Sequence, residues 1–169
     1  GLTRADLRSD RFRRIVHGVH VASGDHGVHT DARAALLVAA SDRAFVSHYL
    51  AARLYGAPVP DTPYLHVSVP HGVKRRRRDG VVVHHSSRSG TTFRGLPVTT
   101  PADTFLDLAP HLDLVDLVVL GDGLVRKGRT TPAALVTAAE QATGRGVRLA
   151  RRAARLVRTG VDSAMESRA

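Results

Sequence analysis

Tyr64-Leu65-His66-Val67-Ser68-Val69 is the stretch that decides the fold class, because apolar side chains alternate along it as they do in a β-strand. Gly80-Val81-Val82-Val83-His84-His85 predicts a second strand, and we expect the two to pair as a hairpin. Phe93, Leu96 and Val98 indicate a third strand. The sequence therefore predicts a small antiparallel sheet in the middle of the chain.

Helical patterns lie on both sides of this sheet. Residues 31–40 are rich in Ala, Leu and Val, with Asp31 as the expected cap, and residues 46–55 carry an apolar stripe that ends at Gly56. Thr100-Pro101 is typical of a helix start. After the helix that it opens, over residues 101–109, further helices are expected over residues 113–127, 131–142 and 147–158. Helices, a small sheet and more helices in this order predict an α+β fold.

The first 21 residues have a different texture. Thr3 and Asp6 have the spacing of a capping box, which predicts a short helix that ends at Ser9-Asp10. Residues 12–21 are rich in β-branched residues and arginine, with Gly18 at the expected turn. A capped helix followed by a basic hairpin is typical of the second half of a winged helix-turn-helix, so a nucleic-acid-binding module is the first hypothesis.

Composition limits the classes of function. With 169 residues, of which 43% are hydrophobic, the chain can bury one core. It has no cysteine, which excludes disulfides, thiolate nucleophiles and cysteine-based zinc sites. No apolar run approaches the length of a membrane span and no signal peptide opens the sequence, so we expect a cytoplasmic protein with no membrane partner.

The formal net charge of +10 is unevenly distributed. Residues 71–94 hold seven cations and one carboxylate, residues 95–125 hold five carboxylates and no Lys or Arg, and residues 126–158 hold nine cations and one carboxylate. Binding to a polyanion is the functional interpretation, because neutralising phosphates releases counterions. The alternative is a compositional bias towards arginine that leaves an ordinary basic surface.

Three groups of cations are the candidate nucleic-acid contacts: the N-terminal arginines, the run expected at a hairpin tip, and one face of the last helix. We expect the first helix to approach bases or phosphates and the hairpin to hold the backbone. The candidates are Arg4, Arg8, Arg11, Arg13, Arg14, Lys74, Arg75, Arg76, Arg77, Arg78, Arg148, Arg151, Arg152 and Arg155.

No catalytic or metal site is expected within the chain. The paired histidines at 17 and 20, and at 26 and 29, lack the carboxylate or thiolate partners that zinc usually has, and His84-His85 directs its rings to opposite faces of a strand. The aspartates between 103 and 122 are expected to be helix caps and surface charges. Gly121-Asp122-Gly123 lacks the strand and the third glycine of a phosphate-binding loop.

Several stretches together resemble the AbiEi-like antitoxin family. These are residues 1–21, with His17 and His20 where the family has Arg and Tyr; residues 47–56, with Leu50 in place of a small hydroxyl residue; and residues 99–109, with Asp103 where Arg is expected. Residues 121–128, 146–160 and 162–168 resemble the actinobacterial branch, in which this region precedes an endonuclease domain similar to very-short-patch-repair enzymes.

The resemblance implies four segments: a partial winged-helix module at residues 1–22, a linker at 23–30, an AbiEi-like α+β domain at 31–160, and the start of a nuclease-like domain at 161–169, which Glu166 would open. It implies a DNA-binding regulatory region like an antitoxin or transcriptional repressor, with double-stranded DNA as partner. One alternative is the targeting region of an endonuclease whose Mg²⁺ ligands would lie downstream. The other is a module that docks a cognate toxin through the acidic residues 103–122.

Overall fold

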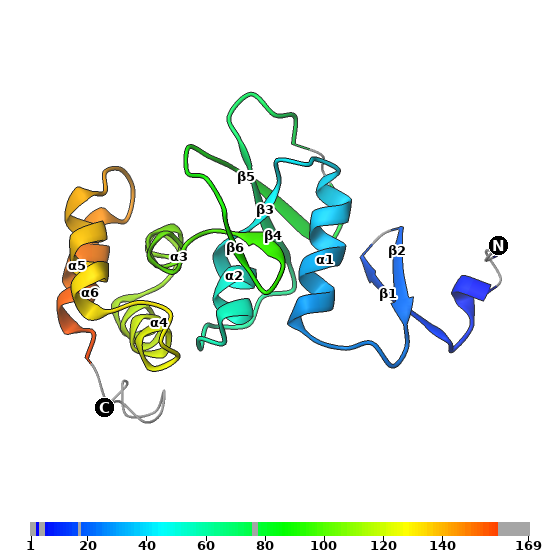
Figure 1. Cartoon of the computed structure of the whole chain (residues 1–169), viewed down its shortest axis with the longest axis horizontal. Helices are drawn as coiled ribbons and strands as arrows, with labels where there is room; N and C mark the ends of the chain where they lie inside the picture. The colour runs from blue at the N-terminus through cyan, green and yellow to red at the C-terminus, as the bar shows by residue number, and fades with distance from the viewer. Residues whose placement is uncertain (1–2, 4–5, 17, 76–77, 159–169) are drawn as a thin grey trace.

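The computed structural model describes residues 3, 6–16, 18–75 and 78–158. Along the long axis of the molecule, Figure 1 shows the N-terminal hairpin, then the helix that follows it, then the larger sheet, and last the C-terminal helices. Helices and sheet strands that are largely segregated along the chain confirm the α+β class.

The N-terminal hairpin is formed by β1 (Phe12–Val16) and β2 (Val19–Ala22), as expected. The capping box is also present: the Thr3 amide donates to Asp6 Oδ2 at 2.7 Å, and the Asp6 amide donates to Thr3 Oγ1 at 3.2 Å. The expected helix is reduced, within the described residues, to one 3₁₀ turn at Asp6–Arg8. The winged helix-turn-helix itself stays a prediction.

The sheet has the strand order β5-β4-β3-β7-β6. Its central strands are β3 (Phe45–Val46), β4 (Leu65–Pro70) and β7 (Leu96–Val98), and its edges are β5 (Val81–Ser86) and β6 (Thr91–Phe93). All five residues from 65 to 69 are buried, so β4 is covered on both faces. This strand holds the centre of the core.

The predicted antiparallel hairpin over residues 64–69 and 80–85 is wrong. β4 and β5 pair in parallel, with Leu65 opposite Val81 and Pro70 opposite Ser86. Residues 71–80 therefore run back from the end of β4 to its start, where the Leu65 amide donates to the Gly80 carbonyl at 2.8 Å. The basic run at 74–78 accordingly lies in a crossover and not at a hairpin tip, and the sheet is mixed and not purely antiparallel.

Two further strands were not expected. Phe45–Val46 forms β3, so the helix α2 (His48–Tyr55) begins two residues later than predicted and still ends at Gly56. Residues 91–98 form the hairpin of β6 and β7 and not a single strand. Its two-residue turn, Arg94-Gly95, has φ values of 49° and 76°, as a type I′ turn requires.

Helix α1 (Val28–Ala39) begins within the expected linker, with Gly27 and not Asp31 at the N-cap. Its first turn brings Asp31 within 3.4 Å of Arg53 on α2, so the two helices are joined by an ion pair. Asp31, which was expected to cap the start of a helix, therefore links two helices instead.

The four C-terminal helices lie close to their predicted bounds. They are α3 (Pro101–Leu108), α4 (Leu114–Arg126), α5 (Pro132–Gln141) and α6 (Val147–Leu156). Thr100, Asp113 and Thr131 each accept a hydrogen bond from the backbone amide three residues later. Capping side chains with this geometry explain why the sequence located these helix starts well.

Helix α4 crosses the interior, and two glycines let neighbouring segments approach its backbone. A Cβ on Gly123 would lie 2.2 Å from Pro58 Cδ, and a Cβ on Gly121 would lie 2.4 Å from Val157 Cγ2. Both distances are shorter than any van der Waals contact. The glycines therefore have a packing role, and the expectation that they form no phosphate loop is consistent with their burial.

We predict that Gly123→Ala lowers the free energy of unfolding by about 1–3 kcal/mol, because its methyl group would displace Pro58. The better helix propensity of alanine, about 1 kcal/mol, opposes this effect without cancelling it. Urea unfolding measures the difference. Thr137→Ala on the exposed side of α5 is the control and should change stability by less than about 0.5 kcal/mol. A Gly123→Ala protein as stable as the parent would contradict the close approach.

Candidate nucleic-acid interface and histidine cluster

The hairpin presents some of its arginines to solvent and uses another internally. Arg11 and Arg14 are exposed, whereas Arg13 is half-buried and donates from Nη2 to the Asp25 carbonyl at 3.4 Å. Arg13 thus joins the hairpin to the segment before α1. Arg4 and the side chain of Arg8 lie outside the described residues.

The second group of cations lies in the crossover, whose last residues contact the hairpin. Lys74, Arg75 and Arg78 are exposed, while Arg76 and Arg77 lie outside the described residues. The crossover meets the hairpin at Gly80, where a Cβ would lie 3.1 Å from Val16 Cγ1. The structure therefore brings two basic segments into contact that are about 60 residues apart in the sequence.

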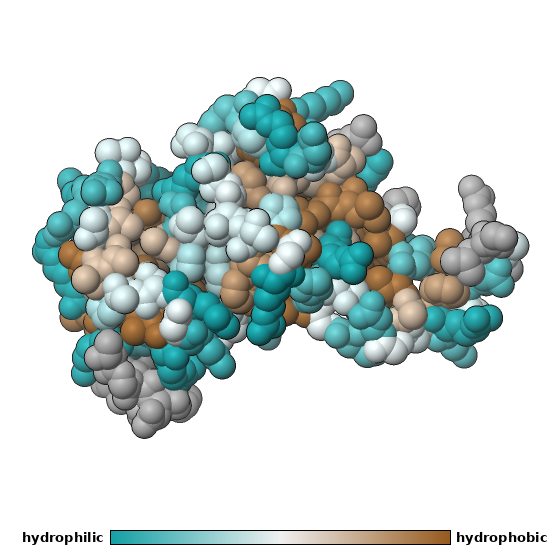
Figure 2. Space-filling model, in the orientation of Figure 1, coloured by the Kyte–Doolittle hydropathy of each residue, from teal (hydrophilic) through white to brown (hydrophobic). Residues whose placement is uncertain are grey.

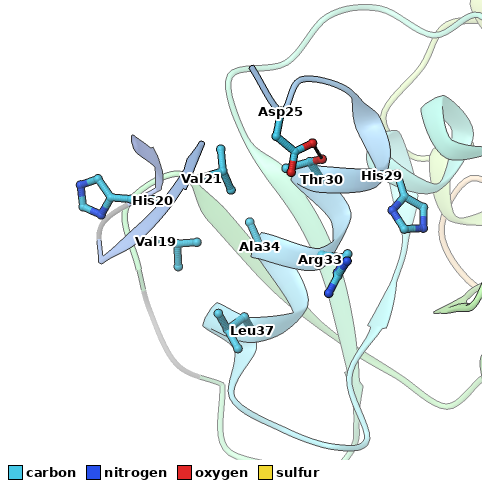
Figure 3. A pocket seen from close by; sticks show the side chains of 9 residues that line it. All are labelled: Val19, His20, Val21, Asp25, His29, Thr30, Arg33, Ala34 and Leu37. Carbon is cyan, nitrogen blue, oxygen red and sulfur yellow. Dashed lines mark hydrogen bonds between the residues drawn. The ribbon is translucent and has the colours of Figure 1, made fainter. Parts of the chain in front are cut away.

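A groove of about 460 Å³ separates β2 from α1 (Figure 3). Val19, Val21 and Leu37 give it an apolar lining, and Figure 2 shows hydrophobic surface over α1 beside the hairpin. Leu37 is 70% exposed. The polar lining includes His20, His29 and Arg33, and a 2.7 Å hydrogen bond joins Thr30 to Asp25. The basic hairpin thus borders a recess that mixes apolar side chains with Arg33, Asp25 and two histidines.

The arginines of α6 are at the other end of the molecule from the hairpin (Figure 1). Arg151 is not a surface cation: its Nε donates to the Ala139 carbonyl at 3.0 Å, and its Nη2 donates to the Glu140 and Ala142 carbonyls at 3.1 Å each. Arg155 lies 3.4 Å from the Glu140 carboxylate. Arg148 and Arg152 are exposed. The predicted basic face exists, but Arg151 is used to close the C-terminus of α5.

We predict that Arg151→Lys lowers the free energy of unfolding by about 1–2 kcal/mol, because an ammonium group cannot reach three carbonyls from one fork. Net charge is unchanged by this substitution. The exposed residue Arg152, changed to Lys, is the matched control on the same helix and should leave the urea midpoint unchanged. Equal midpoints for the two variants would show that the three hydrogen bonds do not stabilise α5.

The acidic stretch at 103–122 is largely turned inward. Asp122 is 3% exposed and accepts from the Arg158 amide at 2.8 Å, and Asp113 caps α4. Asp103 and Asp107 both pair with Arg88. Its Nε lies 2.9 Å from the Asp103 carboxylate, and its Nη1 makes a short contact with the Asp107 carboxylate. Much of the charge that would form a toxin-docking surface is therefore used inside the fold.

The Arg88 ion pairs connect the segment after β5 to α3. Burial raises the pKa of Asp107 to about 6, although Arg88 beside it acts in the opposite direction. Its Oδ2 atom is buried and has no hydrogen-bond partner among the described residues. Asp103 is the other carboxylate partner of Arg88.

Four histidines that the sequence analysis did not single out as a group meet beside the sheet. The His48 ring stacks on the His84 ring, with 3.7 Å between centroids and 13° between planes. His66 Nδ1 lies 3.0 Å from His84 Nε2, and the His111 ring stands edge-on to His48 at 5.7 Å. We call these four residues the histidine cluster. It joins α2, β4, β5 and the end of α3.

The cluster continues into a chain of buried hydroxyls. Ser68 Oγ donates to Ser47 Oγ at 2.8 Å, and Ser47 Oγ lies 3.0 Å from His48 Nδ1. His48 has φ of 52°, an uncommon value for a residue with a side chain. The ring stack and the hydroxyl chain together hold this strained backbone at the start of α2.

Three of these histidines, His48, His66 and His84, are held neutral near pH 7. Burial, reinforced by the neighbouring histidines, lowers the pKa of His48 to about 2 and the pKa values of His66 and His84 to about 4. Parallel stacked rings direct their in-plane lone pairs side by side and not to one point, which is unsuited to metal ligation. Within the described residues there is no group of three or more His, Asp or Glu that could hold a metal ion.

Sequence reasoning missed the cluster because parallel pairing creates it. In the β4–β5 register, His84 lies opposite Ser68, two residues from His66, so all three side chains share one face. A hairpin over the same residues gives a different set of neighbours. The one usable signal was His84 itself, which the sequence correctly assigned to the face opposite His85: the structure bonds His85 to the Val73 carbonyl at 3.0 Å, away from the cluster.

We predict that acid destabilises the protein between pH 6.5 and about 4. Unfolded histidine binds a proton near pH 6.5, whereas His48 and His66 resist it when folded, so stability is full above 6.5 and falls below it. Each of these two contributes up to about 1.4 kcal/mol per pH unit. Asp107 acts in the opposite direction, because its raised pKa makes the folded state hold a proton up to about pH 6.

Chemical unfolding at a series of pH values measures this dependence. His66→Gln should flatten it, and His26→Gln, which changes an exposed histidine outside the cluster, should leave it unaltered. A parent protein whose stability does not change from pH 6.5 to 4.5 would show that the cluster is not neutral.

Comparisons with known proteins give no match: no family model fits the sequence, and a search of curated proteins finds none that is similar. Among the described residues, no helix combines the length and the apolar character that crossing a membrane requires.

Proposed function

We propose that this chain binds double-stranded DNA through the end formed by the β1–β2 hairpin and the crossover between β4 and β5, as a regulatory region of the antitoxin or repressor type. The observation that carries the proposal is the meeting of these two basic segments at Gly80 and Val16. We call this end the basic end. We take as its cations the exposed residues of these two segments, Arg11, Arg14, Lys74, Arg75 and Arg78.

Electrostatics supports the proposal. Exposed guanidinium groups neutralise phosphates and release the counterions condensed on DNA, which supplies most of the non-specific affinity. Asp10 and Asp79 are the nearest acidic residues along these segments, so cations outnumber carboxylates at the basic end. The groove beside β2 adds Arg33 and a lining of apolar side chains next to the same hairpin.

Packing against the core and a hydrogen bond from Arg13 hold the hairpin in a fixed position. Val16 is 5% exposed and belongs to the hydrophobic core, against which Ile15 and Val19 also pack. Arg13 adds its bond to the Asp25 carbonyl. A two-stranded hairpin is marginal alone, so these contacts fix the position from which Arg11 and Arg14 would reach the backbone of the duplex.

We predict that the double variant Arg11→Gln/Arg14→Gln binds a DNA duplex about tenfold more weakly than the parent at moderate salt, with a salt dependence shallower by about two phosphate contacts. Arg75→Gln/Arg78→Gln should have a similar effect from the crossover. Fluorescence anisotropy of a labelled duplex across a salt series gives both the affinity and the slope.

The control is Arg148→Gln/Arg152→Gln, which removes the same two charges from the opposite end of the molecule. Its affinity should stay within about twofold of the parent. A control as damaging as the hairpin variant would mean that total charge, and not the basic end, determines binding. An affinity that does not change with salt would overturn the proposal altogether.

A further inference from the structure

A second recess opens at the edge of the sheet where the parallel strands β4 and β5 end. Its volume is about 530 Å³, and three segments line it: the residues before and at the start of β3, the end of β4, and the loop after β5. We call it the strand-end cavity. Its lining consists of Arg43, Phe45, Pro70, His71, Ser86, Ser87, Arg88, Ser89 and Gly90.

The topology of the sheet explains why these segments meet. β3 runs antiparallel to β4, so the start of β3 lies beside the end of β4, and β5 ends next to it because Pro70 pairs with Ser86. The carboxyl ends of parallel strands are where open α/β sheets commonly bind ligands. The sequence separates Arg43 from Arg88 by more than 40 residues, and the sheet brings them to one recess.

The lining suits an anion with several oxygens. Three serine hydroxyls and two guanidinium groups contribute donors. No Asp or Glu lines the cavity itself, while Asp103 and Asp107 lie behind Arg88 and offset its charge. The backbone amides of Ser87, Ser89 and Gly90 donate to no backbone acceptor within the described residues. Hydroxyls, open amides and arginine are the groups that recognise phosphate oxygens.

Arg88 is held in place from behind. Its Nε and Nη1 atoms pair with Asp103 and Asp107 on α3, which leaves Nη2 outside these two ion pairs. A guanidinium group fixed on two sides loses little conformational freedom when a further oxygen binds. The loop itself is anchored, because the Arg88 amide donates to Ser86 Oγ at 3.0 Å.

Gly90 closes the cavity against the sheet. A Cβ at this position would lie 3.0 Å from Phe45 Cβ and 3.4 Å from the Val98 carbonyl oxygen. The loop therefore lies directly on Phe45, which is 3% exposed. The cavity thus has a buried aromatic floor and a rim of hydrogen-bond donors.

We propose that the strand-end cavity binds a phosphate group, with Arg43, Arg88 and the hydroxyls and amides of residues 86–90 as its ligands. The phosphate would come from a free monoester such as a mononucleotide or from the backbone of a nucleic acid. The proposal goes beyond DNA binding by the basic end, since none of the five cations of the basic end lines the cavity.

Nuclear magnetic resonance of the whole ¹⁵N-labelled chain, titrated with inorganic phosphate and separately with AMP at constant ionic strength, tests the site. We expect saturable shifts at the amides of Ser87, Ser89 and Gly90. Arg43→Gln should raise the dissociation constant for phosphate at least about fivefold, because Asp103 and Asp107 offset the charge of Arg88 and the variant removes the charge of Arg43. Arg148→Gln, with the same charge change on α6, should leave it within about twofold.

Binding of a short DNA duplex to the parent and to Arg43→Gln separates the two sources of phosphate. If Arg43→Gln weakens duplex binding as well as phosphate binding, a backbone phosphate occupies the cavity; if only phosphate and AMP are affected, the ligand is a free monoester. Shifts that do not saturate, that sodium chloride reproduces, or that Arg43→Gln does not change would overturn the proposal. Loss of DNA binding in the Arg11→Gln/Arg14→Gln variant does not bear on it.

Discussion

The rest of the structure depends on strand β4 and on the direction of its neighbours. Residues 65–69 are buried on both faces, with antiparallel β3 on one side and parallel β5 on the other. A parallel partner requires a connection that returns along the whole strand, and residues 71–80 make that return here, with no helix among the described residues 71–75 and 78–80. The return places the basic crossover against the hairpin and leaves the strand ends to form a cavity.

The same strand places polar side chains where they must be satisfied internally. His66 and Ser68 point from β4 to the face that carries His84, and the start of α2 covers them with Ser47 and His48. Burying polar groups is unfavourable unless they bond to one another, so a stack of neutral rings and a chain of hydroxyls forms. This network explains how His48 is kept at φ of 52°.

Local signals in the sequence predicted most of the helices and strands. The wrong prediction was the direction in which two strands pair, which depends on residues far apart in the sequence. Thr100, Asp113 and Thr131 cap their own helices, and Gly56 ends α2, so these bounds depend only on nearby residues. The direction of β5 relative to β4 depends on the path of the connection between them, and the apolar pattern of residues 80–85 is the same for either direction. The histidine cluster and the strand-end cavity both follow from this direction and so were not predictable, whereas the hairpin that carries Arg14 was.

The structure also changes what the net charge of +10 means for function. Arg13, Arg53, Arg88 and Arg151 bond to carboxylates or carbonyls that link elements of the fold. Arginine is suited to this work because its fork reaches several acceptors at once. Charge counted along the sequence therefore overstates the basic surface. Exposed cations remain on the hairpin and on α6, and others, such as Arg43 and Arg94, lie between them. At the hairpin, Arg11 and Arg14 stand beside a recess and close to a second basic segment. Position, and not total charge, is the argument that favours DNA binding there.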